Sequence, residues 1–156
     1  MKWTRQDLDQ YVQAKEYVDT VIVPLIPFHI SDDAGLGKDA LQREVMSLFT
    51  RELERELSGR ILLFPDYHYL KSAGKEAEAE RINAWIEDIR YQPFHHIFFI
   101  TADSGWKKLE QDMQGTLIWL PAIVTESTKA RERQSVIHSQ VQQVTELIRS
   151  YWKDNK

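Results

Sequence analysis

The chain has 156 residues, of which 42% are hydrophobic and 28% are charged, and these values are typical of a folded globular protein. Its formal net charge of -4 argues against non-specific nucleic-acid binding, and the absence of cysteine excludes disulfides, thiol nucleophiles, iron–sulfur clusters and cysteine-based zinc sites. No apolar run approaches the roughly 20 residues that span a bilayer, and the first residues lack the apolar core of a signal peptide, so we expect a cytoplasmic protein.

The first half of the chain alternates between helical and strand-like hydrophobic patterns. Thr4 and Asp7 resemble a capping box and predict a short first helix. The continuous apolar run 21–26, rich in β-branched residues, predicts a strand buried on both faces. After a polar stretch that we interpret as a flexible turn, an apolar stripe over residues 38–57 predicts a long helix. Residues 60–64 predict a second strand.

The second half repeats this alternation. Apolar residues at helical spacing over 82–89 predict a helix, and residues 95–101 predict the most apolar strand. A short helix is expected from Asp103 or Ser104, followed by a fourth strand over 116–121. The last segment carries a stripe close to heptad spacing, which predicts a long C-terminal helix. This stripe consists of Ile137, Val141, Val144, Ile148 and Tyr151.

Four apolar strands separated by helical segments predict a single α/β domain over residues 1–156. We expect a three-layer sandwich with a mainly parallel sheet of about four strands, Rossmann- or flavodoxin-like, and a long C-terminal helix. The connection between the third and fourth strands barely accommodates a crossover helix. An antiparallel or edge placement of the fourth strand is therefore the alternative.

Ligands of a parallel sheet sit outside the carboxyl ends of its strands, so the residues that follow the strands are the candidates for binding. At the start of the last helix, free amides, hydroxyls and basic side chains would favour a phosphate, sulfate or carboxylate. The predicted ligand-binding residues are Asp66, His68, Asp103, Ser127, Thr128, Lys129 and Arg131. The alternative is that the acidic residues form turns or helix caps and that the basic segment is a solvated first turn.

Each catalytic motif fails at a defining residue. Gly35 and Gly37 lack the remaining residues of a phosphate loop or a dinucleotide fingerprint, and Ser104 lacks the preceding glycine of a nucleophile elbow. The spacing of the Asp and His residues matches no metal motif. We therefore expect no metal and no cofactor, and whether the protein is an enzyme stays open.

The aromatic residues and the C-terminal stripe bear on possible partners. Trp85 and Trp119 lie inside predicted elements and are expected in the core, whereas one of the tryptophans near element ends could line a pocket or a partner surface. The stripe could pack on the protein's own sheet, or bind a protein partner or a second copy of the chain. The residues predicted for that contact are Val141, Val144, Ile148, Tyr151 and Trp152.

Several segments together resemble a small family of uncharacterised proteins from Gram-positive spore-forming bacteria, known only as a domain of unknown function. These segments are Lys2-Trp3-Thr4, Glu16–Thr20 leading into Pro24–Pro27, and His96–Thr101 with Trp106. The resemblance covers essentially the whole chain. It implies a bacterial cytoplasmic protein and supplies no catalytic residue.

These observations favour a non-enzymatic accessory, regulatory or protein-interaction role, because every catalytic pattern is incomplete. The alternative is an enzyme or sensor that binds a small phosphorylated or nucleotide-like ligand at the carboxyl edge of the sheet. Nucleic-acid binding is not expected, since the chain is acidic overall.

Overall fold

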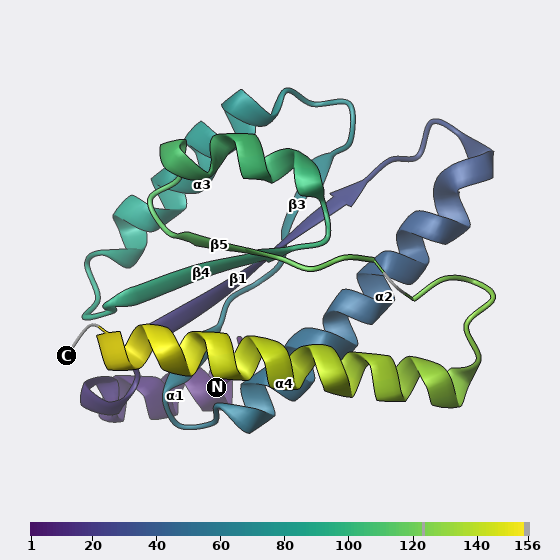
Figure 1. Ribbon diagram of the computed structural model, residues 1–156. Coiled ribbons are helices and arrows are strands. Elements are labelled where there is room, and N and C mark those ends of the chain that lie inside the picture. The colour runs from purple at the N-terminus through teal and green to yellow at the C-terminus, as the bar shows by residue number, and fades with distance from the viewer. Residues whose placement is uncertain (123, 155–156) are drawn as a thin grey trace.

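The computed structural model describes residues 1–122 and 124–154. The elements of the first half are α1 (Arg5–Gln13), the short 3-10 helix η1 (Lys15–Tyr17), β1 (Thr20–Phe28), α2 (Asp33–Glu56), β2 (Ile61–Leu63) and β3 (Tyr67–Leu70). Those of the second half are α3 (Lys75–Ile89), β4 (His96–Thr101), the 3-10 helix η2 (Ser104–Asp112), β5 (Thr116–Trp119) and α4 (Ala130–Asp154). The predicted α/β class and the long C-terminal helix are confirmed (Figure 1).

Every strand pair among the described residues is parallel. The main path of the sheet runs β2-β1-β4-β5, and β3 pairs with β1 beyond the end of β2. The predicted fourth strand, β5, pairs in parallel with β4 and lies at the end of the strand order, so the antiparallel alternative is wrong and the edge placement is confirmed. The connections reverse direction between β1 and β4, which makes this pair the topological switch point of the sheet.

The fifth strand, β3, lies in a segment where the sequence indicated only a polar break. Tyr67 and Tyr69 are buried, whereas His68 and Leu70 are exposed. This alternation over four residues is too short to be distinctive in the sequence. The strand forms because β1 is nine residues long and extends past β2, leaving Leu25–Phe28 free to pair with β3.

Helix α2 begins at Asp33, earlier than expected. The Asp32 side chain accepts a hydrogen bond from the Ala34 amide (3.2 Å) and caps the helix. Gly35 and Gly37 therefore lie within the first turns of α2, and the expected flexible turn at these glycines is wrong. The cap satisfies an amide that a loop would leave to solvent, and this explains the longer helix.

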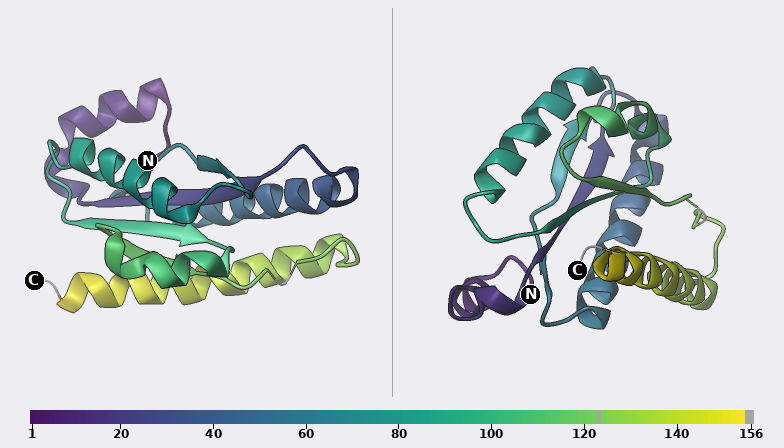
Figure 2. Two further views of the ribbon diagram at one scale, coloured as in Figure 1. Left: turned by 90° about the horizontal axis from the view of Figure 1, so that it is seen from above. Right: turned by 60° about the vertical axis from the view of Figure 1, so that its left-hand side comes forward.

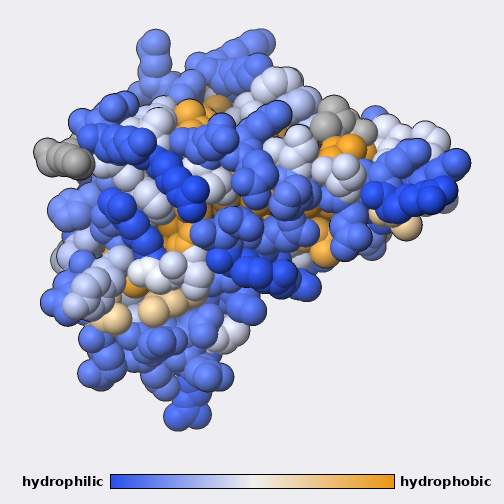
Figure 3. Space-filling model, turned by 60° about the horizontal axis from the view of Figure 1, so that its bottom comes forward, coloured by the Kyte–Doolittle hydropathy of each residue, from blue (hydrophilic) through white to orange (hydrophobic). Residues whose placement is uncertain are grey.

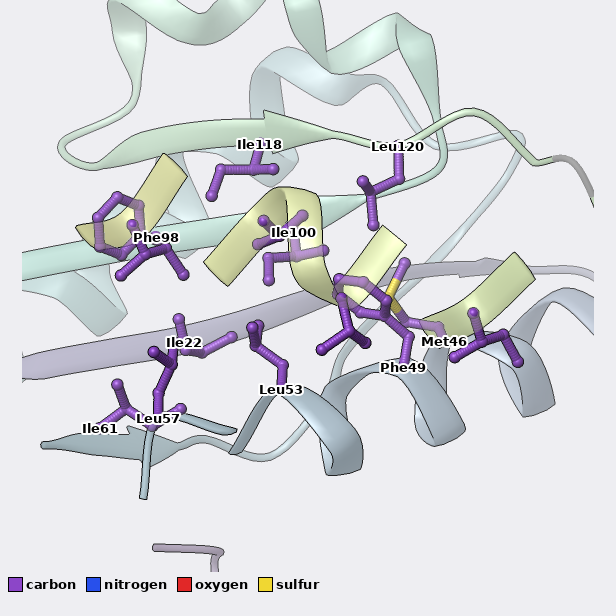
Figure 4. Close-up of a cluster of buried hydrophobic side chains, with 14 of the residues drawn as sticks. Ile22, Met46, Phe49, Leu53, Leu57, Ile61, Phe98, Ile100, Ile118 and Leu120 are labelled. Atoms are coloured by element: carbon purple, nitrogen blue, oxygen red, sulfur yellow. The ribbon is translucent and has the colours of Figure 1, made fainter. Parts of the chain in front are cut away.

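Two layers of helices cover the sheet. Helices α2 and α4 lie on one face, and α3 and η2 lie on the other, as Figures 1 and 2 show. The face toward α2 and α4 buries a cluster that includes Phe49, Leu53 and Phe98 (Figure 4). A smaller cluster around Tyr11 and Val18 packs α1 beside β2. Three layers form because successive side chains of each strand point to opposite faces of the sheet, and helices cover both faces.

The apolar stripe of α4 faces the sheet of the same chain. Ile137, Val141, Val144 and Ile148 are all buried in the cluster that α4 shares with α2 and the sheet. When the underside of Figure 1 is turned forward, mostly hydrophilic side chains are visible, with hydrophobic ones in narrow strips between them (Figure 3). No helix of the described residues is both long enough and apolar enough to cross a membrane.

Candidate functional site

A pocket of about 360 Å³ opens at the carboxyl edge of the sheet, where β1 and β4 end. This is the topological switch point, the position at which open α/β sheets bind their ligands. The polar and charged side chains of its lining are Lys38, Asp39, Gln42, Arg43, Lys71, Lys75 and Asp103. The remaining lining residues are Leu25, Ile26, Pro27, Met46, Ala102 and Ala122.

The charges around the pocket are unbalanced. Four cationic side chains face two carboxylates, although the whole chain carries a net charge of -4. Lys71 pairs with Asp39 (2.5 Å), and Lys75 pairs with Asp103 (3.3 Å). Among the described residues, Lys38 and Arg43 form no ion pair, and both side chains are exposed. The pocket therefore keeps two cations available for an anion.

Asp103 is held in place by a chain of hydrogen bonds. The Tyr69 hydroxyl donates to Asp103 Oδ2 (2.6 Å), the Gly105 amide donates to Asp103 Oδ1 (2.9 Å), and the buried Trp106 indole donates to the Tyr69 hydroxyl (2.8 Å). Burial raises the pKa of Asp103, but these donors and Lys75 outweigh it and hold the pKa below its ordinary value. Burial and the neighbouring Asp103 raise the pKa of Tyr69. Asp103 is therefore a fixed negative charge.

Asp39 is similarly constrained. Its carboxylate lies 2.5 Å from His29 Nδ1 and accepts a hydrogen bond from Lys71 Nζ. Burial raises the pKa of Asp39, but Lys71 and His29 outweigh it and lower the pKa below its ordinary value. His29 Nε2 also lies 3.1 Å from the Asp32 carbonyl oxygen, so the ring ties the segment after β1 to the start of α2. The charged wall of the pocket is thereby fixed to both elements.

The arrangement is suited to binding rather than to proton transfer. A carboxylate with a lowered pKa is a weak base and is not protonated near neutral pH, so it cannot serve as a general acid there. The two free cations can neutralise an anion, while the apolar floor can cover its body. Among the described residues, no group of three His, Asp or Glu side chains is placed to hold a metal ion.

Of the seven residues predicted for ligand binding, the structure brings Asp103 into the lining of this pocket. Asp66 and His68 lie 3.9 Å apart but are not part of the described lining, and the His68 ring meets Phe28 edge to face. The role of Asp66 and His68 as ligands stays a prediction, as does that of the predicted residues in the segment 127–131.

The segment 125–131 forms a turn and the start of α4. The Thr128 hydroxyl accepts a hydrogen bond from the Thr125 amide (3.0 Å), and the hydroxyls of Thr125 and Ser127 are 2.9 Å apart. The sequence predicts that the last helix starts between Thr125 and Thr128, whereas α4 begins at Ala130. Lys129 and Arg131 are exposed and lie outside the pocket lining.

Sequence reasoning missed most of the pocket. The sequence predicts no ligand contact for Lys38, Gln42 and Arg43, whereas these residues lie near the carboxyl edge because α2 starts there. A helix that follows a parallel strand begins at the carboxyl edge of the sheet, and this rule could have identified the first turns of the helix as part of the site. Lys71 and Lys75 were missed because β3, which positions them, was not predicted.

The tryptophans also differ from expectation. Trp119 is 37% exposed, with Lys107 Nζ 3.6 Å from the centre of its ring, so its expected place in the core is wrong. Trp85 is half-buried and packs against Tyr67 and the α3 cluster. Trp106, one of the tryptophans near element ends that could line a pocket or a partner surface, is fully buried and donates a hydrogen bond to Tyr69 behind the pocket wall.

The residues predicted for a partner contact are engaged within the chain. Val141, Val144 and Ile148 are buried against its own sheet, and Tyr151 meets Phe98 edge to face. The Trp152 indole donates to the Thr20 hydroxyl (2.9 Å). A contact through α4 stays a prediction, and it would have to use side chains outside this buried stripe.

Comparison with known proteins supports a family of unknown function. The family model described as "Protein of unknown function (DUF2487)" matches residues 9–152. The "Uncharacterized protein YpiF" of Bacillus subtilis (strain 168) is 25% identical over 152 residues, which cover 97% of this chain and 98% of that protein. No solved structure matches the chain.

Proposed function

The chain belongs to the family of proteins of unknown function DUF2487, and for it we propose a binding function: the pocket at the carboxyl edge holds a small anionic molecule that bears a phosphate or a carboxylate. The observation that carries this proposal is a pair of cations, Lys38 and Arg43, that have no ion-pair partner among the described residues, in a pocket whose carboxylates already have theirs. The protein would act as an accessory or regulatory binding protein.

The position of the pocket supports the same proposal. It lies at the switch point between β1 and β4, and its walls come from five separate segments that the parallel sheet brings together. Both ion pairs in the wall fix lysines that would otherwise be mobile, since Lys71 is held by Asp39 and Lys75 by Asp103. A positioned set of cations loses less conformational entropy when it binds an anion.

A binding role is favoured over catalysis by the state of the carboxylates. A general acid or base near neutral pH needs a pKa close to that pH, and both Asp39 and Asp103 are shifted away from it. The pocket offers charge and shape, and those are the properties that a sensor or carrier requires.

The proposal is tested by thermal unfolding and calorimetry with inorganic phosphate and small carboxylates. Lys38→Ala with Arg43→Ala should abolish anion-dependent stabilisation. The matched control, Lys108→Ala with Arg149→Ala, removes the same charge from exposed positions outside the pocket and should retain it. A third variant, Lys129→Ala with Arg131→Ala, tests the site predicted at the start of α4. Loss of binding in that variant alone would move the anion site there and contradict the proposal.

A further inference from the structure

The pocket is charged on one side and apolar on the other. Resting on the proposed function, we infer that its ligand is an aliphatic anion, a carboxylate or phosphate ester carrying a short non-aromatic chain, and not a nucleotide. Three features carry this inference: the sequence of side chains along α2, the recess that continues the apolar floor, and the chemistry of the lining.

One face of α2 changes from charged to apolar as the helix passes beneath the sheet. Asp39, Gln42, Arg43 and Met46 are spaced three, four and seven residues apart, so they share a helical face. Arg43 is exposed, whereas Met46 is 7% exposed and belongs to the core cluster. A ligand that meets Arg43 with its charge therefore finds apolar side chains at its other end.

The apolar floor continues into a second, smaller recess. This recess has a volume of about 20 Å³, enough for about one water molecule, and it shares Gln42, Met46, Ala102 and Ala122 with the main pocket. Its other walls come mainly from apolar residues: Val45, Phe49, Leu120, Pro121, Val124 and Gln140. The Gln42 side-chain amide donates to the Val124 carbonyl (2.9 Å), which holds the segment after β5 against α2. The recess suits the end of an alkyl chain.

The described lining of the main pocket lacks the features that bind nucleotides. It contains no aromatic side chain on which a base could stack, and such stacking is typically worth about 1–3 kcal/mol per base. The glycines that could form a phosphate loop, Gly35 and Gly37, lie within the helix α2. At Gly35 a Cβ atom would be 2.9 Å from the His29 ring, so this backbone is packed against a side chain.

The volume is also small. About 360 Å³ lies near the lower end of the range of roughly 300–1,000 Å³ that is usual for ligand pockets. A charged head group with a chain of a few carbons fits this size. The structure thus favours an amphipathic ligand in which the anion and the alkyl chain are recognised by different walls.

The test is a series of probes measured by isothermal titration calorimetry at constant ionic strength: inorganic phosphate, acetate, butyrate, hexanoate, monobutyl phosphate and adenosine monophosphate. Each methylene buried on the apolar floor should tighten binding about fourfold. Hexanoate should therefore bind much more tightly than acetate, and monobutyl phosphate more tightly than inorganic phosphate. Adenosine monophosphate should bind no more tightly than inorganic phosphate.

A variant that fills the apolar floor of the pocket tests where the alkyl chain binds. Ala122→Leu places a larger side chain at an exposed position of the lining, so it should fold, retain acetate and phosphate binding, and lose the dependence on chain length. Ala77→Leu, at an exposed position of α3 outside the pocket, is the control and should leave the whole series unchanged.

The outcomes separate this inference from the proposed function. If phosphate and acetate bind through Lys38 and Arg43 but chain length has no effect, or if adenosine monophosphate binds most tightly, the aliphatic ligand is overturned and the anion site stands. If no probe binds, inorganic phosphate included, both are contradicted. A chain-length dependence that survives in Ala122→Leu would place the alkyl chain elsewhere and would also overturn the inference.

Discussion

The two halves of α2 differ in what they contact, although they form one continuous helix. The second half buries Phe49 and Leu53 between the sheet and α4 (Figure 4). The first half carries Lys38, Asp39 and Arg43 to the rim of the pocket. The helix starts at the carboxyl edge and runs back beneath the sheet, so only its first turns lie where a ligand can reach them (Figure 1). Position along the helix therefore separates stability from binding.

The largest effect is expected where α4 meets the buried half of α2. Val144 is 3% exposed, and Val144→Asp would place an unpaired carboxylate in the core cluster. Such burial costs several kcal/mol, a large share of the roughly 5–15 kcal/mol that stabilises a domain, so we expect the variant to be unfolded at 25 °C by circular dichroism. Gln143→Asp, at an exposed position of the same helix, should fold normally. A folded Val144→Asp protein would show that the stripe is not part of the core.

A smaller effect is expected within α2 itself. Phe49→Ala should reduce the free energy of unfolding by about 3–5 kcal/mol, because it removes a fully buried ring and leaves a cavity. The neighbouring Leu48 is 42% exposed, and Leu48→Ala should cost less than about 1 kcal/mol. Urea denaturation of the pair measures the difference. Equal losses would contradict the burial of this half of the helix.

The next largest effect is expected in the pocket wall, where Asp103 should make the free energy of unfolding depend on pH. The pKa of Asp103 is lowered in the folded protein, so the carboxylate stabilises the fold above its unfolded pKa of about 3.9, and this contribution is lost as the pH falls through the folded pKa. Asp103→Asn should therefore destabilise the protein at neutral pH by about 1–2 kcal/mol, and the difference from the wild type should shrink toward pH 2. Urea midpoints measured from pH 7 to pH 2 test this. A constant difference across that range would assign the loss to packing instead of charge.

The smallest effect on stability is expected at the first half of α2. Lys38→Ala with Arg43→Ala removes two exposed side chains that have no ion pair among the described residues, and it should change the free energy of unfolding by less than about 0.5 kcal/mol in the absence of anions. Urea denaturation without anions measures this change. A loss of several kcal/mol would show that these cations stabilise the fold, and would contradict the assignment of stability to the second half of α2 alone.

Strand β3 and the pocket show where local pattern is too weak to predict structure. Four residues with alternating burial carry little periodic signal, and β3 forms because β1 presents a free edge beyond β2. Lys71 and Lys75 depend on that strand for their position, so they could not be assigned to a site from the sequence. Asp103 could be predicted because it follows an apolar strand whose end is evident in the pattern of residues.

By itself, the sequence determined the class of fold and the order of most elements. Apolar runs such as 21–26 must be buried on both faces, and the stripe of α4 must cover apolar surface, because exposing them to water would cost hydrophobic free energy. Only the tertiary structure decided which polar side chains converge at the carboxyl edge. Nothing in the local sequence distinguishes a pocket position from a solvent-exposed one for Lys38 and Arg43. The path of α2 across the sheet places them in the same pocket as Asp103, and this long-range property is not encoded in any local periodicity.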